Sequence, residues 1–224
     1  MGTQSQVLFI EEHREKLLEP VLEVGSRDYG TTPNYRRIFG LRDYTGIDLS
    51  LGSGVDVVVD LSASADAVTG LLGDRRFRTV ICMSVLEHCA RPFQMAENIQ
   101  RLMMPGAHLF VSVPFAWRVH GYPDDFWRFT PRGVQQLFPE IDFLPPQLST
   151  SEDGDRAMWD DYARRIELRG RVGMERGLYG FTTAALISLL RRARGLSYLT
   201  RALRYPYLLP PVHVDMIGQR RPGQ

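Results

Sequence analysis

The sequence lacks several features that mark common protein classes. Its 224 residues include only two cysteines, Cys82 and Cys89, which are not in a CxxC spacing. Neither a disulfide scaffold nor a thiolate metal site is therefore expected, and reduced thiols are typical of a cytoplasmic protein. Lysine and arginine (27) nearly balance aspartate and glutamate (26), so the formal net charge is only +1. Without a basic field, we expect no nucleic-acid partner.

Long uninterrupted apolar segments are also missing. Residues 1–18 carry charges and lack the apolar core of a signal peptide. The longest uncharged run near the C-terminus, residues 177–190, is shorter than the roughly 18 to 20 residues that cross a bilayer. There is no internal repeat and no low-complexity tract. We expect a single domain over residues 1–224 without a transmembrane segment.

What the sequence does contain is a regular alternation of strand-like and helix-like segments. Apolar, β-branched runs predict strands at 21–24, 44–50, 55–61, 77–85 and 108–115. Before, between and after them, caps, prolines and helical periodicity predict helices at 8–18, 33–39, 62–73, from Pro92 to the stop at Pro105-Gly106, and 130–138. This alternation indicates an α/β protein with a doubly wound, mostly parallel sheet.

The alternation is lost after about residue 145. We expect residues 145–209 to form a helical insertion that binds substrate or acts as a lid, before a last strand at 212–220 that returns to the sheet edge. Within it, residues 182–204 place leucines on one side and arginines elsewhere. That pattern fits helices packed on the domain with a solvated basic face, a lid, a homodimer contact or a surface resting on anionic lipid.

Acidic residues and a glycine follow three successive predicted strands. In doubly wound sheets, ligands lie beyond the carboxyl ends of the strands. Gly25, after the first strand, lets the backbone approach a ligand because it has no Cβ. Asp48, at the end of the second, is placed to bind both hydroxyls of a ribose, and Asp60, at the end of the third, suits an adenine amine. Each feature alone fits an ordinary turn or cap, but the three together favour a nucleotide-like ligand.

Five motifs in a fixed order carry a family resemblance. VLEVGS, YTGID, VVVDL, VICMSVLEH and RLMMPGAHLFVSVP together resemble class I S-adenosylmethionine-dependent methyltransferases, most closely the small-molecule, type 11-like branch. The resemblance covers residues 18–140, implies a Rossmann-like fold with these residues as the cofactor-binding core, and implies S-adenosylmethionine as the cofactor. The binding residues it implies are Glu23, Gly25, Ser26, Arg27, Asp48, Leu49, Asp60, Leu61, Met83 and Ser84.

The resemblance also assigns a part of the cofactor to each of these groups. The turn at 23–27 would surround the methionine part, Asp48 would hold the ribose, and Leu49 would lie beside the adenine. Residues 60–61 would contact the adenine edge, and residues 83–84 would lie near the sulfonium.

The first turn departs from the family pattern at Arg27, where a glycine is usual. An arginine there either pairs with the cofactor's carboxylate or narrows the pocket. The departure supports one alternative, a catalytically silent scaffold or interaction module. A nicotinamide-dependent dehydrogenase is disfavoured, because the first turn lacks the middle glycine of G-x-G-x-x-G.

The stretch 113–133, VPFAWRVHGYPDDFWRFTPRG, follows the fifth predicted strand and should face the transferred methyl group. His120 suits a general base that removes a hydroxyl proton, because the pKa of histidine is about 6.5. Alternatively, an aspartate of this stretch pairs with Arg128 and braces the loop. The candidate substrate-binding residues are Trp117, Tyr122, Asp124, Asp125, Trp127 and Arg128.

Two further assignments follow from the same region. Neighbouring aspartates rarely both face one ion, so we expect no metal at residues 124–125. Glu87 and His88 of the VLEH motif are interpreted as capping or packing residues. The sequence therefore predicts methyl transfer to a small-molecule acceptor, in particular a hydroxyl oxygen of a sugar or natural product, because an imidazole base helps an alcohol more than an amine.

Overall fold

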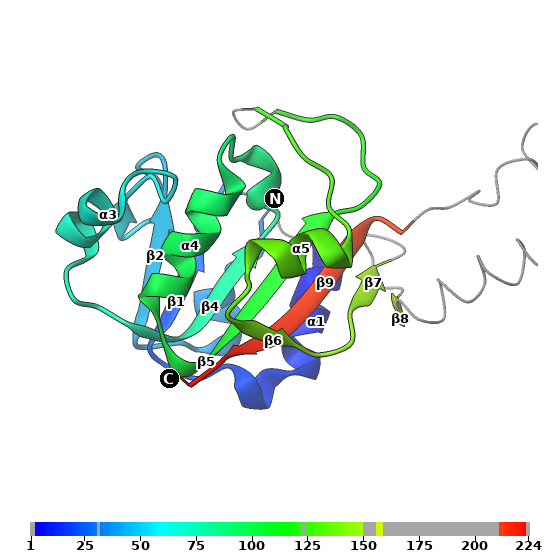
Figure 1. Cartoon of the computed structure of the whole chain (residues 1–224), viewed down its shortest axis with the longest axis horizontal. Helices are drawn as coiled ribbons and strands as arrows, with labels where there is room; N and C mark the ends of the chain where they lie inside the picture. Colours follow the sequence, from blue (N-terminus) through cyan, green and yellow to red (C-terminus); the bar gives the residue numbers. More distant parts are fainter. Residues whose placement is uncertain (1–2, 31, 122–123, 150–155, 159–210, 223–224) are drawn as a thin grey trace, which may run out of the picture. The chain divides into compact units, whose positions relative to one another are not determined.

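A computed structural model of the chain (Figure 1) describes residues 3–30, 32–121, 124–149, 156–158 and 211–222. The chain divides into two compact units, residues 1–156 with 211–224, and residues 157–210. The basic segment 182–204 and nearly all of the predicted insertion 145–209 lie outside the described residues, so the roles expected for them stay predictions. The fold below is that of the first unit.

Five parallel strands form the main part of its sheet. They are β1 (Val21–Val24), β2 (Tyr44–Asp48), β3 (Val57–Val58), β4 (Phe77–Met83) and β5 (Met103–Pro114). Their order is β3-β2-β1-β4-β5, so the direction of winding reverses between β1 and β4. Val24 pairs with Ile47 on one side and Cys82 on the other, which brings the carboxyl ends of these three strands together. The predicted doubly wound sheet is confirmed.

The last strand extends this sheet in the opposite direction. β9 (His213–Arg220) pairs antiparallel with β5, with Val113 opposite Val214. The sequence predicted this strand but placed it at the edge of the sheet. That placement is wrong, because β6 (Ile141–Phe143) and β7 (Gln147–Ser149) pair with the other side of β9. A further short strand is β8 (Arg156–Met158). Strands of three residues show no periodicity, and the sequence predicted none of them.

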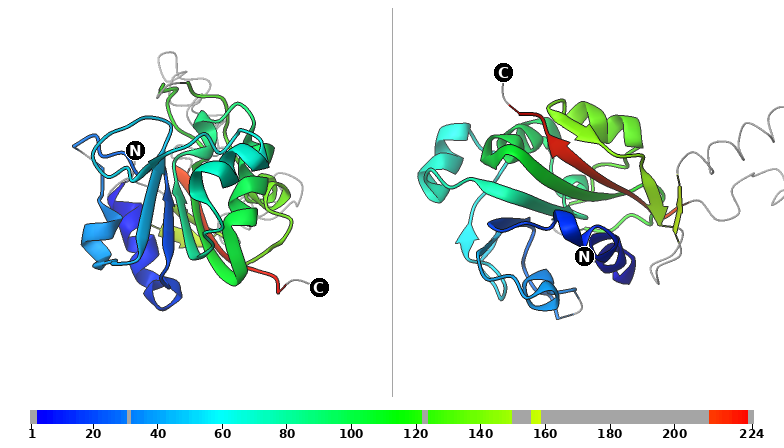
Figure 2. Two further views of the ribbon diagram at one scale, coloured as in Figure 1. Left: turned by 90° about the vertical axis from the view of Figure 1, so that its left-hand side faces the viewer. Right: turned by 90° about the horizontal axis from the view of Figure 1, so that it is seen from below.

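Helices cover both faces of the sheet. Figure 2 shows α1 and α2 on one side and α4 and α5 on the other. Phe9 of α1 and Phe39 of α2 belong to a buried cluster with Ile81 of β4 and Phe110 of β5. The described helices are α1 (Gln4–Glu12), η1 (Arg14–Lys16), α2 (Tyr35–Phe39), α3 (Ala65–Leu72), η2 (Leu86–His88), α4 (Pro92–Leu102) and α5 (Pro131–Leu137).

Two boundaries differ from the prediction. Pro105-Gly106 does not end α4; the helix ends at Leu102, and β5 begins at Met103 and runs through both residues. The Arg220 guanidinium donates a hydrogen bond to the Met103 carbonyl at 2.5 Å, which ties the start of β5 to β9. β3 is reduced to two residues because it is the last strand in the sheet order, paired only with β2 and with Val58 42% exposed.

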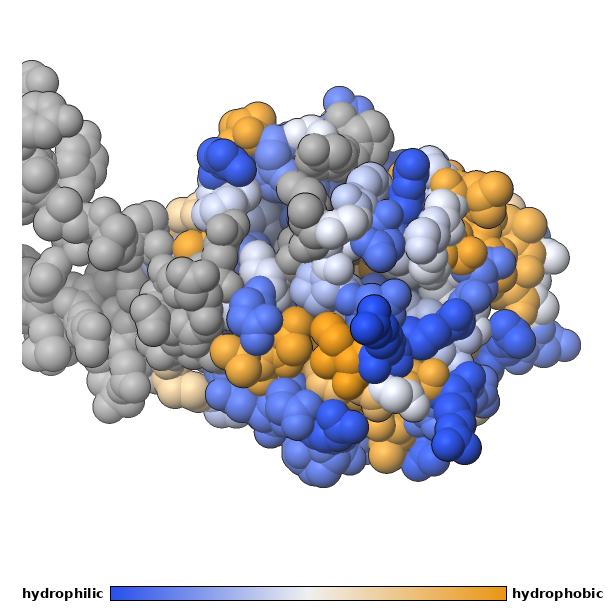
Figure 3. Space-filling model, turned by 180° about the vertical axis from the view of Figure 1, so that it is seen from behind, coloured by the Kyte–Doolittle hydropathy of each residue, from blue (hydrophilic) through white to orange (hydrophobic). Residues whose placement is uncertain are grey.

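Figure 3 shows the face opposite to that of Figure 1, where the apolar side chains of the described residues gather in two areas with hydrophilic side chains around them. In the described part of the chain, no helix combines the length and the apolar character that crossing a membrane requires.

Candidate functional site

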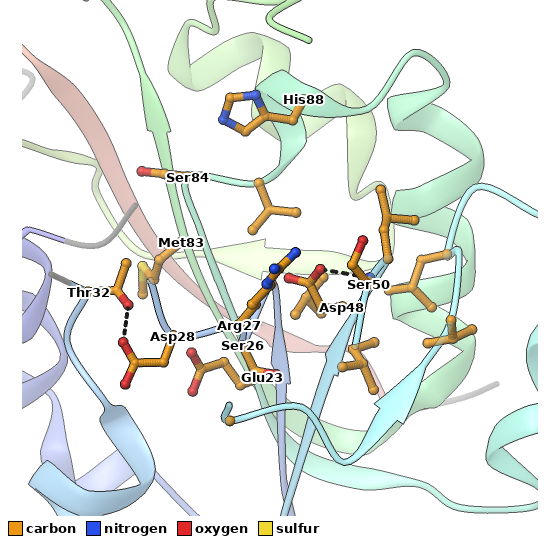
Figure 4. A pocket seen from close by; sticks show the side chains of 18 of the residues that line it. Glu23, Ser26, Arg27, Asp28, Thr32, Asp48, Ser50, Met83, Ser84 and His88 are labelled. Carbon is orange, nitrogen blue, oxygen red and sulfur yellow. Dashed lines mark hydrogen bonds between the residues drawn. The ribbon is translucent and has the colours of Figure 1, made fainter. Parts of the chain in front are cut away.

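A cavity of about 610 Å³ opens where the carboxyl ends of β1, β2 and β4 meet (Figure 4). This is the point at which the winding of the sheet reverses, the usual ligand position in doubly wound folds. The cavity is lined by all the residues predicted to bind a cofactor, namely Glu23, Gly25, Ser26, Arg27, Asp48, Leu49, Asp60, Leu61, Met83 and Ser84. The structure therefore brings these residues together, while their individual contacts with a ligand stay predictions.

The first turn of the cavity wall requires glycine. Gly25 has φ +77°, a backbone conformation that residues with a Cβ rarely adopt, and a Cβ there would lie 2.5 Å from Val85 Cγ2. The amides of Gly25 and Ser26 both donate to the Ile47 carbonyl, at 2.8 and 3.0 Å, which fixes the turn against the end of β2. The backbone thus leaves open space in which a ligand can approach it closely.

Arg27 is accommodated by a second glycine. Its guanidinium lies over the Tyr29 ring, 5.1 Å from the centroid, and its side chain points into the cavity (Figure 4). A Cβ on Gly52 would lie 2.9 Å from Arg27 Nε, so the loop after β2 makes room for the arginine. Arg27 therefore occupies part of the cavity with a cationic group.

The carboxylates of Asp48 and Asp60 are held by similar turns. Asp48 Oδ1 accepts from the Ser50 amide at 3.0 Å, and Asp60 Oδ1 accepts from the Ser62 amide at 2.7 Å. In each turn one carboxylate oxygen binds the backbone two residues ahead. The two acids thus have defined orientations at the cavity wall.

Glu23 is a buried acid in the same wall. Its side chain accepts a hydrogen bond from the Tyr44 hydroxyl and is 7% exposed. Burial raises the pKa of Glu23 to about 7, although the Tyr44 hydrogen bond and the charge of Arg36 oppose the shift. A buried carboxylate of this kind is suited to bind a cationic ligand group.

Ser84, at the end of β4, has a strained backbone. It is the one non-glycine residue in the described part of the chain with positive φ, at 54°. The fully buried Gln6 side chain of α1 donates to Ser84 Oγ and to Ser112 Oγ, both at 2.8 Å. Gln6 therefore ties α1 to the ends of β4 and β5. The sequence gives no sign of this contact, because the partners are 78 and 106 residues apart.

Two histidines meet at one end of the cavity. His88 of η2 lines the cavity, and Figure 4 shows it far from Glu23. The His120 ring meets the His88 ring edge to face, with centroids 4.9 Å apart, but His120 is not part of the cavity wall. Interpreting His88 as a packing residue thus missed its exposure to the cavity. Burial lowers the pKa of His88, which favours the neutral imidazole.

The hydrogen bonds of both rings identify their tautomers. His88 Nδ1 is 2.6 Å from the Asp124 carbonyl oxygen, and His120 Nδ1 is 3.2 Å from the Arg118 carbonyl oxygen. A carbonyl oxygen only accepts, so Nδ1 is the donor in both rings. When such an imidazole is neutral, its Nε2 carries the lone pair.

The loop after β5 is braced by an ion pair, as the alternative interpretation of this stretch proposed. Arg128 donates to both oxygens of Asp125, at 2.5 and 2.8 Å, and also to the carbonyls of Trp117 and Arg118. The Arg128 hydrogen bonds hold the pKa of Asp125 well below its usual range. Asp125 in turn accepts from the His120 amide at 2.8 Å.

Three other predicted substrate-binding residues, Trp117, Asp124 and Trp127, lie in this loop and are not part of the cavity wall. Trp127 Nε1 donates to the Cys89 carbonyl at 2.9 Å, and the Trp117 ring lies 6.2 Å from that of His213. Asp124 contributes its backbone carbonyl to His88, and Tyr122 is outside the described residues. Their contact with a substrate stays a prediction.

Glu87 completes the histidine cluster. Its side chain is 1% exposed, and its Oε2 has no hydrogen-bond partner among the residues that the structure describes. Glu87 Oε1 is 3.8 Å from His88 Nε2. Burial raises the pKa of Glu87 to about 7. The sequence interpretation as a capping or packing residue accounts for the burial but not for the unpaired oxygen.

Comparison with known proteins adds a family match. Residues 5–170 match the family described as a methyltransferase domain, which is well over half of the chain. A search of curated proteins finds no match.

Solved structures share the fold at low sequence identity. The 1,6-didemethyltoxoflavin-N1-methyltransferase of Burkholderia thailandensis, solved with S-adenosylhomocysteine, is 12% identical with a TM-score of 0.54, over 97% of this chain and 76% of that one. The [4+2]-cyclase SpnF is 16% identical with a TM-score of 0.54, over 97% and 81%. An S-adenosylmethionine-dependent methyltransferase of Archaeoglobus fulgidus is 12% identical with a TM-score of 0.52, over 97% and 95%. At these identities the matches establish the fold.

Proposed function

The chain belongs to the methyltransferase domain family, and from this premise we propose that it methylates a hydroxyl oxygen of a small molecule, a sugar or a natural product. The methyl donor is S-adenosylmethionine, which supplies an electrophilic methyl group on a cationic sulfur. Methyl transfer is an in-line displacement, so the protein acts mainly by aligning the acceptor and by assisting loss of its proton.

Two features of the cavity support this donor, namely the space at its first turn and the charge of its wall. The absence of a Cβ at Gly25 leaves space at the first turn, and the buried Glu23 carboxylate suits the donor's ammonium group. We assign the ribose to Asp48 and the adenine edge to residues 60–61, because these groups line the same cavity at successive strand ends. Met83 and Ser84, also in the wall, would lie near the reactive carbon.

The histidine pair supports an oxygen acceptor. An alcohol is a weak nucleophile until its proton is removed, and a positioned imidazole can accept that proton. His120 was proposed for this role, and His88 is the member of the pair that lines the cavity. The observation that carries the proposal is that both rings hold Nδ1 as a donor, which leaves Nε2 able to accept a proton.

A methylation screen tests the proposal. Sugars, natural-product alcohols and matched amines are incubated with the enzyme and S-adenosylmethionine, and the products are identified by mass spectrometry. We expect methyl ethers. His120→Ala should keep its affinity for the donor and turn over roughly 10²- to 10⁴-fold more slowly.

Asp48→Ala should show the opposite pattern. A hydrogen bond to a charged group contributes about 1.5 to 3 kcal/mol. Without the Asp48 carboxylate, the affinity for the donor should therefore fall at least tenfold. Asp66→Ala, an exposed acid in the first turn of α3, is the matched control and should behave as wild type. Methylation of amines alone would contradict the oxygen acceptor, and wild-type turnover by His120→Ala would remove the role of His120.

A further inference from the structure

We propose that Glu87, His88 and His120 bind a divalent first-row transition-metal ion beside the cavity. One ligand atom from each side chain lies within 4.8 Å of the others. Two of the three are neighbours on η2, and the third comes from the loop after β5. The inference rests on the proposed function and specifies how that site activates a hydroxyl group.

The hydrogen bonds of the two histidines suit metal ligation. Metal-binding imidazoles usually donate their other N–H to a carbonyl or carboxylate, which fixes the tautomer and the ring orientation. His88 Nδ1 donates to the Asp124 carbonyl, and His120 Nδ1 lies 3.2 Å from the Arg118 carbonyl and 3.1 Å from Asp125 Oδ2. Both Nε2 atoms are thereby left as lone-pair donors, the form that a metal ion requires.

Glu87 provides an independent indication. A buried carboxylate oxygen without a partner is costly, so few occur in native proteins without a ligand, an ion or a water. Glu87 Oε2 is such an atom. The backbone around it is fixed, because the Phe126 amide donates to the Glu87 carbonyl at 2.8 Å. A cation at the cluster would supply the missing partner.

The ligand set indicates the kind of ion. Two imidazoles and one carboxylate favour first-row transition ions such as Mn²⁺, Co²⁺ or Zn²⁺, whereas Mg²⁺ and Ca²⁺ prefer oxygen ligands. Glu87 Oε1 and His88 Nε2 are 3.8 Å apart. Two ligands on a tetrahedral centre with bonds of about 2.0 Å would be roughly 3.3 Å apart. Glu87 and His88 are thus close to ligand spacing, and the ligand atom of His120, within 4.8 Å of both, would move toward them on binding.

The same inference explains why the loop after β5 is so heavily bonded. Asp125 accepts from Arg128 through both oxygens and lies beside the Nδ1 of His120. The chain Arg128–Asp125–His120 forms the carboxylate–histidine arrangement that orients a metal ligand from behind. Asp125 and Arg128 then act as positioning residues.

Three protein ligands leave open positions on the ion, and His88 faces the cavity. A hydroxyl group bound there has a lower pKa, because the cation stabilises the alkoxide. The hydroxyl proton passes to water, the oxygen electron pair forms the new C–O bond, and the carbon–sulfur bond breaks with its electrons left on sulfur. In this form of the mechanism His120 serves as a ligand, and the ion takes over the task of a base.

Cobalt binding tests the site without requiring turnover. The whole 224-residue chain is treated with a chelator, dialysed and titrated with Co²⁺ by calorimetry and absorption spectroscopy. We expect one ion per chain, with absorption bands of nitrogen and oxygen ligation. His120→Ala and Glu87→Gln should weaken binding at least tenfold, and Asp125→Asn about 10- to 100-fold. His13→Ala, which removes a histidine packed against Phe9, should bind as wild type.

The outcomes separate this inference from the proposed function. Affinity for S-adenosylhomocysteine, measured on every variant, shows that the variant is folded. Absence of stoichiometric Co²⁺ binding, or equal binding by folded His120→Ala and Glu87→Gln, overturns the metal site. Full methylation of a hydroxyl by chelator-treated enzyme would overturn it as well, and would leave the oxygen acceptor standing. Loss of methylation on chelation, restored by Mn²⁺ or Co²⁺, supports both.

Discussion

At the scale of single residues, the cavity wall limits which side chains fit, and Gly25 is the clearest example. Its φ of +77° and the position of Val85 leave no room for a side chain. We expect Gly25→Ala to destabilise the fold by about 1 to 2 kcal/mol from the left-handed backbone alone, with a further loss from the contact with Val85. Donor affinity should fall as well, because the methyl group would alter the turn.

Gly70→Ala is the matched control for that substitution. Gly70 lies within α3, and a Cβ there meets nothing within 4 Å. Alanine should therefore stabilise the helix by about 0.5 to 1 kcal/mol. Urea unfolding of both variants measures the contrast, and equal stabilities would show that the turn at Gly25 tolerates a side chain.

Glu23 should make stability depend on pH. Its folded-state pKa of about 7 lies above the ordinary glutamate value of 4.5, so the folded state binds the proton more tightly. The resulting stabilisation is fully present below pH 4.5 and is lost as the pH rises to 7. The shift corresponds to roughly 3 kcal/mol.

Glu23→Gln keeps a hydrogen-bond acceptor for Tyr44 and removes the titration. We expect its free energy of unfolding to fall less than that of wild type between pH 5 and 7, as measured by denaturant unfolding at several pH values. The other acids titrate in both proteins, so the difference isolates Glu23. Parallel curves for the two proteins would contradict the raised pKa.

The sequence predicted the position of a cavity residue correctly where that residue lies at the end of a strand. Asp48 and Asp60 could be placed at the cavity because each ends a recognisable apolar run. Glu87 and His88 could not be distinguished from capping residues, because their relation to His120 depends on how a loop 32 residues later folds back. Gln6 was missed for the same reason.

At the scale of elements, α1 is joined to the sheet through one side chain. Gln6 donates to the hydroxyl of Ser84, directly after β4, and to that of Ser112 in β5, so its loss leaves two buried serines without that partner. Gln6→Leu is expected to destabilise the protein by about 1 to 3 kcal/mol. It should also weaken donor binding, because Gln6 holds Ser84 in its strained conformation at the cavity wall.

Gln4→Leu is the control, since Gln4 is an exposed residue of the same helix. Thermal unfolding and donor titration of both variants compare a buried and an exposed change in one element. If Gln6→Leu matched Gln4→Leu in both measurements, the hydrogen bonds of Gln6 would have no role in supporting the cavity.

The longer helices and strands could be predicted from the sequence, but the residues at which they begin and end could not. Helix α5 was predicted from Thr130 and Pro131, and Thr130 Oγ1 indeed accepts from the Gly133 amide at 3.1 Å. β5 was predicted to begin at residue 108, because proline and glycine usually separate elements. The start of β5 at Met103 is set by pairing with Phe77 of β4 and by the hydrogen bond from Arg220, whereas the pairing with β9 begins only at His108. Local sequence contains no record of these contacts.

At the scale of the whole molecule, the cavity couples ligand binding to global stability. It is lined by segments from β1, β2, β4 and η2, so a ligand there contacts several parts of the first unit at once. Donor at 100 times its dissociation constant should stabilise the fold by about 2.7 kcal/mol. For a protein of this size, that corresponds to a rise in Tm of roughly 5 to 11 °C.

Thermal shift with three ligands separates the functions that share this fold. S-adenosylmethionine and S-adenosylhomocysteine should raise the Tm, and Asp48→Ala should reduce the rise at a fixed ligand concentration. NAD should have no effect, because the first turn places Arg27 where a dinucleotide site has a glycine, so the backbone cannot approach a pyrophosphate there. A rise with NAD alone would require a different ligand for the cavity, whereas no rise with any nucleoside would mean that Arg27 closes the space that Gly25 leaves open.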